Sequence, residues 1–133
     1  MRDPERAKSI KTIERRIKPL VKTLNQRGIR TIGSCQGHFG YDEPKEVTEK
    51  SYLELVISRE KFSEIQEIIL GSFGRERKNW FEFKNMPKRN SDLIYGTINI
   101  FPPKDRSPQE QRKAVDRVFK KLIRLFQECY PLV

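Results

Sequence analysis

Three glycines, one of two cysteines and the only histidine of this 133-residue chain lie close together in the sequence. The segment reads TIGSCQGHFG from Thr31 to Gly40. Thiol and imidazole groups serve as nucleophiles, bases and metal ligands, and glycines allow turns in which backbone N–H groups converge. The segment is therefore the first candidate for a site. Its predicted ligand-loop residues are Ser34, Cys35, Gln36, Gly37 and His38.

A thiol enzyme is one interpretation of this segment. The spacing of Gly33, Cys35 and Gly37 is typical of a nucleophile elbow, and GSCQGH resembles the thiol elbow of the class I glutamine amidotransferases. Those enzymes activate the thiol with a later histidine and carboxylate, whereas no histidine follows His38 here. A base three positions from its thiol is an unfavourable arrangement, so we rank this interpretation third.

A structural zinc site is disfavoured, because it needs four Cys or His ligands and the chain offers Cys35, His38 and the distant Cys129. We therefore predict no metal site. Two cysteines so far apart also give no disulfide framework, and thiols inside cells are normally reduced.

An anion cradle is a further interpretation, since Gly33, Gly37 and Gly40 would let backbone N–H groups converge on a phosphate or carboxylate. The spacing matches neither a Walker loop nor a dinucleotide fingerprint. A tight turn after a strand, with Cys35 as a small buried side chain, explains the same residues without a ligand. The residues alone leave both interpretations open.

Hydrophobic periodicity indicates the elements that must position this segment. A basic amphipathic helix is expected from about residue 5 to 27, with Gly28 as its cap and with Pro19 as a kink or second start. A strand over 29–32 should lead into the glycine segment. Residues 41–50 lack periodicity and predict a solvated loop.

The rest of the chain predicts two more helices and three more strands. Strands are expected over 52–57, around 80–83 and over 93–101, where Ile94, Ile98 and Ile100 share a face. Ser58 should cap a helix ending near Gly71 or Gly74. The sequence SPQE from Ser107 predicts the start of a long C-terminal helix. Its apolar face should hold Val115, Val118, Phe119, Leu122, Leu125, Phe126 and Cys129.

The order α-β-β-α-β-β-α predicts an α+β fold with a largely antiparallel sheet covered by helices. At this length we expect residues 1–133 to form a single domain. No apolar run approaches the ~20 residues of a membrane span, and the N-terminal residues MRDPERAKSIK are too charged for a signal peptide. We therefore expect a cytoplasmic protein with no membrane contact.

The net charge points to a polyanionic partner. The chain has 28 Lys and Arg residues against 18 Asp and Glu residues, which gives a formal charge of +10. A heat-adapted surface, as in a thermophile, is the alternative, but it adds charges of both signs and explains a net excess poorly. The predicted nucleic-acid contacts are Arg75, Arg77, Lys78, Trp80, Lys84, Lys88, Arg89, Lys113, Arg117, Lys120 and Arg124. Trp80 is the candidate for base stacking, while Phe81 and Phe83 are expected in the core.

A resemblance covers roughly residues 10–40. The basic helix containing IKPLVKTLN, followed by a strand and TIGSCQGH, resembles the N-terminal signature of the wybutosine-synthesis tRNA methyltransferases. That family has an I-x-x-L-I-x-x-I-N helix and a T-S-S-C-S-G-R loop. By this resemblance Ser34, Cys35 and Gly37 fall on the family's loop, and His38 stands where the family has arginine. The resemblance implies a tRNA substrate and S-adenosylmethionine as methyl donor.

Charge and resemblance together favour an RNA-associated protein that acts in tRNA modification. The alternative is a non-catalytic domain that binds nucleic acid or serves as a scaffold. The sequence leaves open whether the chain catalyses a reaction.

Overall fold

The structure is a computed structural model that describes residues 13–41 and 47–133, except for the side chains of residues 75, 76 and 78. The described residues form an α+β fold in the predicted element order. The elements are α1 (Lys18–Gln26), β1 (Arg30–Cys35), β2 (Ser51–Ser58), α2 (Arg59–Arg77), the 3-10 helix η2 (Lys78–Trp80), β3 (Phe81–Pro87), β4 (Leu93–Ile100) and α3 (Pro108–Cys129). None of these helices has the length and apolar character needed to cross a membrane.

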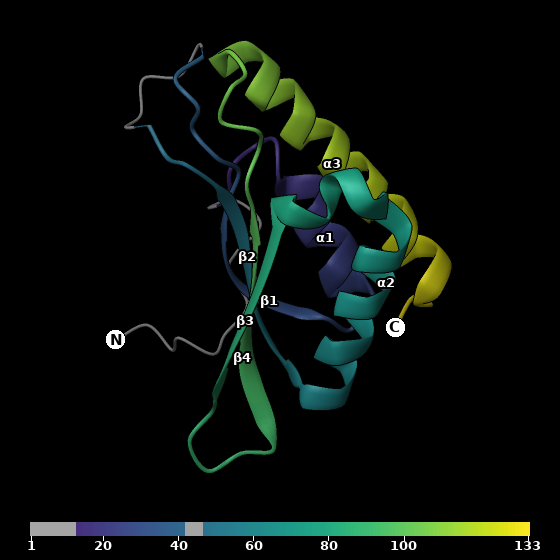
Figure 1. The fold of residues 1–133 in the computed structure, drawn as a ribbon. Helices are drawn as coiled ribbons and strands as arrows, with labels where there is room; N and C mark the ends of the chain where they lie inside the picture. Colours follow the sequence, from purple (N-terminus) through teal and green to yellow (C-terminus); the bar gives the residue numbers. More distant parts are fainter. Residues whose placement is uncertain (1–12, 42–46) are drawn as a thin grey trace.

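The four strands form one antiparallel sheet in the order β1-β2-β4-β3. Figure 1 shows this sheet nearly edge-on, with α1, α2 and α3 on one side of it. Successive side chains of a strand point to opposite faces of the sheet, so Ile94, Ile98 and Ile100 of β4 all point into the core, as predicted. Because the helices cover one face only, alternate residues of the same strands project from the open face. Cys35, Tyr52, Asn99 and Glu82 lie in register across that face.

The first helix is shorter than predicted. It begins at Lys18, and the described residues before it form turns, while residues 5–12 of the expected helix lie outside the described residues. Pro19 occupies the first turn, because a proline has no N–H to donate within a helix and disfavours helical geometry in the residue before it. Pro19 is thus a helix start, one of the two roles expected for it. Gly28 ends the helix as predicted, with a φ of 75°.

Two strand boundaries also differ from the prediction. β1 continues beyond residue 32 to Cys35, with a register shift between Thr31 and Gly33, so the first part of the glycine segment is strand rather than loop. Trp80 belongs to η2 and precedes β3, where it accepts a hydrogen bond from the Phe101 N–H at 2.7 Å. The 3-10 turn directs the chain from α2 into the edge strand.

The helix caps follow the sequence closely. Ser58 Oγ accepts a hydrogen bond from the Lys61 N–H at 3.2 Å, and α2 is interrupted at Gly74, where φ is 74°. Ser107 Oγ accepts from the Glu110 N–H at 3.2 Å and donates to the Glu110 carboxylate at 2.9 Å. On α3 the predicted apolar face is buried or half-buried, but Cys129 is exposed at the last turn. Neither cysteine forms a disulfide bond.

Gly96 provides a test of how the helical layer meets the sheet. A Cβ atom at Gly96 would lie 2.6 Å from the Phe62 ring, whereas a Cβ atom at the exposed helical Gly71 would contact nothing within 4 Å. We expect Gly96→Ala to lower the free energy of unfolding by about 1–3 kcal/mol, because the core must shift to admit the methyl group. The matched control Gly71→Ala should raise it by about 0.5–1 kcal/mol. Equilibrium urea unfolding of both variants measures the difference, and equal effects would contradict the packing.

Candidate functional site

Cys35 is the last residue of β1 and lies on the open face of the sheet beside Tyr52. It lines a cavity of about 500 Å³. The other lining residues are Thr48, Glu49, Lys50, Tyr52, Glu82, Lys84 and Phe101. The thiol therefore faces a cavity of a size that small-molecule sites have.

The His38 side chain is held by a residue that sequence analysis did not single out, Glu14. The imidazole Nε2 lies 2.6 Å from Oε2 of Glu14, and the two side chains are only 8% and 18% exposed. The other carboxylate oxygen of Glu14 accepts a hydrogen bond from the Gln36 backbone N–H at 3.0 Å. Glu14 therefore joins the segment before α1 to the segment after β1.

The backbone of the glycine segment is largely satisfied within the chain. The Gln36 N–H binds Glu14, and the His38 N–H donates to Thr48 Oγ1 at 2.8 Å. Gly37 has a φ of 86°, and a Cβ atom there would lie 2.4 Å from the Phe39 ring. Two of the N–H groups that a cradle would offer to an external anion thus already have partners in this protein.

Arg16 fixes the same segment to the helical layer. Its guanidinium donates to the Gly37 carbonyl at 2.5 Å and to the Asp116 carboxylate of α3 at 2.8 Å. The Arg16 backbone N–H donates to the Gln36 side-chain carbonyl at 2.7 Å. These contacts bring residues from three parts of the chain to one place.

Glu14, Cys35 and His38 form a group in which one potential ligand atom from each residue lies within 4.8 Å of the others. Sequence analysis named the thiol and the imidazole but missed the carboxylate. Glu14 lies 21 positions before Cys35, in a run of charged residues with no signal that separates it from its neighbours. Only the fold brings it to the loop.

Two ionisable groups of the open face have altered pKa values. Burial raises the pKa of Tyr52, and the charges of Cys35, Glu54 and Glu14 raise it further. A hydrogen bond from the Asn99 amide, 2.8 Å from the Glu82 carboxylate, is the main cause that lowers the pKa of Glu82. At neutral pH the cavity beside Cys35 therefore has a neutral phenol on one side and an ionised carboxylate on the other.

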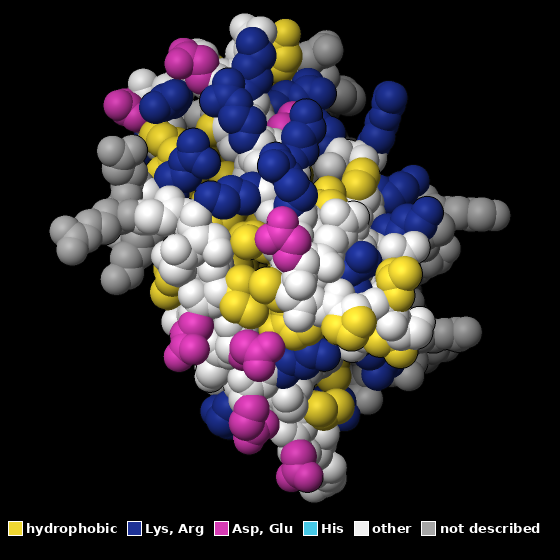
Figure 2. All heavy atoms as spheres, turned by 90° about the vertical axis from the view of Figure 1, so that its right-hand side faces the viewer, with side chains coloured by type: hydrophobic (Ala, Val, Ile, Leu, Met, Phe, Trp, Pro, Cys, Tyr) yellow, Lys and Arg dark blue, Asp and Glu magenta, His cyan; other side chains and the backbone are white. Residues whose placement is uncertain are grey.

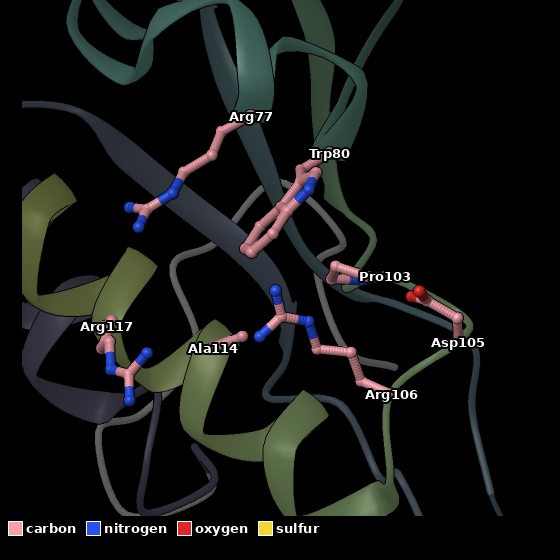
Figure 3. Close-up of a pocket in the computed structure, with 7 residues that line it drawn as sticks. All are labelled: Arg77, Trp80, Pro103, Asp105, Arg106, Ala114 and Arg117. Carbon is pink, nitrogen blue, oxygen red and sulfur yellow. The ribbon is translucent and has the colours of Figure 1, made fainter.

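A second cavity, which we call the arginine cleft, lies at the end of the molecule where α2 ends and α3 begins. Its volume is about 400 Å³, and it is lined by Arg77, Trp80, Pro103, Asp105, Arg106, Ala114 and Arg117. Figure 3 shows the three arginine side chains reaching toward the space beside the indole ring, with the Asp105 carboxylate next to Pro103. The Arg77 guanidinium lies 5.6 Å from the centre of the Trp80 ring.

The lining of the arginine cleft has three arginines against one carboxylate, that of Asp105. Among the described residues, Arg77, Arg106 and Arg117 have no carboxylate partner within ion-pair distance. Figure 2 shows Lys and Arg side chains gathered most densely over the upper part of the helical face, while Asp and Glu are scattered over both its upper and its lower part. The positive potential is therefore concentrated at the end of the molecule that holds the cleft.

The predicted nucleic-acid contacts divide into several groups in the structure. Arg77, Trp80 and Arg117 meet at the arginine cleft, where Arg106 is a further member that sequence analysis missed. Lys113, Lys120 and Arg124 are exposed along α3, as a solvated stripe predicts. The side chains of Arg75 and Lys78 lie outside the described part of the structure.

The basic residues that follow Trp80 lie away from the arginine cleft. Lys84 is on the open face, 3.6 Å from Glu82, and Lys88 and Arg89 are at the turn between β3 and β4. Figure 1 places that turn at the opposite end of the sheet from the start of α3. The basic residues predicted before and after β3 are thus not one surface.

Comparison with known proteins gives no matching family model, no matching curated protein and no matching solved structure. The resemblance of residues 10–40 to the wybutosine-synthesis methyltransferases stays a prediction.

Arg16 gives a test of how the loop is held. Arg16→Met removes the donors to Gly37 and Asp116, so we expect the free energy of unfolding to fall by about 1–3 kcal/mol. The loop should also open more often, and Cys35 should react several-fold faster with an alkylating reagent in a Cys129→Ser background. The matched control is Arg15→Met, which removes an exposed arginine. If both variants are alkylated at the same rate, Arg16 does not restrain the loop.

Proposed function

We propose that this protein binds RNA in the cytoplasm and takes part in tRNA modification. The arginine cleft is the observation that carries RNA binding, because it combines three guanidinium groups, which form no ion pair with any described carboxylate, with one aromatic ring in a single cavity. Guanidinium groups pair with phosphates through two parallel hydrogen bonds, and an indole ring stacks on a base. The net charge of +10 adds long-range attraction for a polyanion.

The shape of the arginine cleft favours an unpaired nucleotide over a regular duplex. A cavity of about 400 Å³ is of the size that holds a small ligand. The bases of a duplex are stacked inside the helix, whereas those of loops and bulges can turn outward and stack on aromatic side chains. Folded tRNA presents such nucleotides in its loops. The link to tRNA modification itself rests on the resemblance of the loop from Ser34 to His38.

S-adenosylmethionine, which the resemblance implies, does not fit the glycine segment as a cradle. The N–H groups of Gln36 and His38 bind Glu14 and Thr48, and the space beside Gly37 is filled by Phe39. We therefore derive no methyl-transfer step. These contacts favour the second candidate function, a non-catalytic RNA-binding domain whose glycine segment is structural.

The arginines of the cleft can be tested against Arg124, an arginine of α3 outside the cleft. We expect Arg106→Ala and Arg117→Ala each to weaken tRNA binding about threefold to tenfold and to reduce the slope of log affinity against log salt by about 0.7, the value for one lost phosphate contact in a single-stranded segment. Arg124→Ala makes the same change in charge from an exposed position outside the cleft. Its effect should be smaller. Fluorescence anisotropy of labelled tRNA at several salt concentrations measures both quantities.

Two outcomes of this titration oppose the proposal. Equal losses in Arg117→Ala and Arg124→Ala would assign binding to the charge of α3 as a whole. Affinity that does not change with salt would exclude phosphate contacts altogether.

Trp80 is the only tryptophan of the chain, so its fluorescence reports on the arginine cleft directly. We expect tRNA to quench this fluorescence with the same midpoint as the anisotropy titration. Trp80→Leu should weaken binding by about 1–3 kcal/mol, and Trp80→Phe, which keeps a ring, should weaken it less. Binding that leaves the fluorescence unchanged would place the RNA elsewhere.

Transfer of labelled methyl groups from S-adenosylmethionine to undermodified tRNA separates the two candidate functions. Incorporation would establish a methyltransferase. RNA binding without incorporation would support the non-catalytic domain.

A further inference from the structure

Three metal-ligating side chains meet where β1 ends. The thiol of Cys35, the imidazole of His38 and the carboxylate of Glu14 each place a potential ligand atom within 4.8 Å of the other two. The residues come from two segments about 20 positions apart, so the group is assembled by the fold. This chemistry is distinct from that of the arginine cleft.

The types of ligand agree with one class of ion. Zn²⁺ binds thiolate, imidazole and carboxylate groups, whereas Mg²⁺ and Ca²⁺ prefer oxygen ligands alone. Catalytic zinc sites commonly use three protein ligands and leave one position for water or substrate. No metal site was predicted from the sequence, because a structural zinc site needs four Cys or His ligands and the nearby carboxylates of Asp42 and Glu43 would complete one only by chance. The position of Glu14 completes a set of three.

The surroundings hold these ligands in place. The Gln36 N–H donates to Oε1 of Glu14 at 3.0 Å, which orients the carboxylate as outer-shell partners do in metal sites. The His38 backbone is fixed from both sides by Thr48: its N–H donates to the Thr48 hydroxyl, and its carbonyl accepts from the Thr48 N–H at 2.6 Å. The Gly37 conformation lets the chain turn between Cys35 and His38.

The environment also favours a cation over an anion. The Glu14 side chain is 18% exposed, and an ionised carboxylate at such a partly buried position attracts a cation and repels an anion. Glu54 adds a further carboxylate on the open face, paired in register with Gly33.

We propose that Glu14, Cys35 and His38 form a zinc site whose fourth position opens toward the cavity beside Cys35. Tetrahedral coordination requires about 3.4 Å between the histidine nitrogen and the carboxylate oxygen. The contact of 2.6 Å between His38 and Glu14 must therefore lengthen by less than about 1 Å when the ion enters. Zn²⁺ binds the thiolate form of a cysteine and the neutral form of a histidine, as in other protein zinc sites.

The zinc site does not depend on RNA binding. Its ligands lie outside the arginine cleft, and neither Cys35 nor His38 lines that cleft. If the protein does not bind RNA, the zinc-site proposal is unaffected. If it does not bind zinc, the RNA-binding proposal is unaffected.

Cobalt substitution tests the site in the full chain. Co²⁺ added to chelator-treated protein should bind one ion per chain and give a thiolate-to-cobalt charge-transfer band, and Zn²⁺ should displace it. Cys35→Ser should abolish the band, while the matched control Cys129→Ser, which removes the other and exposed cysteine, should keep it. We expect Glu14→Gln, which preserves the size of the side chain, to weaken Zn²⁺ binding more than about 100-fold, beyond the loss typical of an outer-shell partner.

Two results would overturn the zinc site. One is a charge-transfer band that persists in Cys35→Ser, and the other is the lack of any such band in the unaltered protein. Equal Zn²⁺ affinity of the unaltered protein and Glu14→Gln would show that Glu14 and His38 form an ion pair only. His38→Asn adds a third ligand variant. Circular dichroism shows whether His38→Asn folds. If it does not fold, the variants at Cys35 and Glu14 still test whether the zinc site exists.

Discussion

The half-buried carboxylate of Glu14 is the constraint on which the loop depends. Removing a carboxylate from water is costly unless donors surround it, and Glu14 takes its donors from the Gln36 N–H and from His38. The segment before α1 and the end of β1 are therefore fixed to each other. Arg16 continues the same network to α3 through Asp116. The shape of the glycine segment results from these charged contacts, and the glycines only permit it.

The cavity beside Cys35 and the arginine cleft share one connecting segment, the chain between β4 and α3. Phe101 lines the cavity, Pro103 lines the cleft, and the Phe101 N–H donates to the Trp80 carbonyl at 2.7 Å. A displacement of this segment would therefore change both sites. The two sites still differ in chemistry, because the cleft has three guanidinium groups and one carboxylate, whereas the cavity has a thiol, two carboxylates and two lysine side chains. They are suited to different ligands.

The sequence was sufficient to predict those parts of the fold that depend on local patterns. The element order, the alternation of β4 and the cap at Ser107 follow from periodicity and from side-chain hydrogen bonding to the backbone. The role of Glu14 could not be predicted. Its partners are about 20 positions away in the sequence, and the residues that follow it, Arg15 and Arg16, are also charged, so nothing in the sequence distinguishes Glu14 from them. For the same reason Arg106 was missed: it stands alone before Ser107, and only the packing of α3 brings it to the arginine cleft.

Net charge predicts attraction to a polyanion but not where the contact lies. On the open face Lys84 is partly offset by Glu82, and on α2 the exposed Glu60 and Glu67 carry charge of the opposite sign. Arginines with no ion-pair partner among the described carboxylates collect around Trp80 (Figure 3). A guanidinium group is weakly hydrated and already stacks on the indole ring there, so little order is lost when it meets a phosphate. The location of uncompensated charge, more than its sum, is what makes the arginine cleft the strongest candidate for RNA contact.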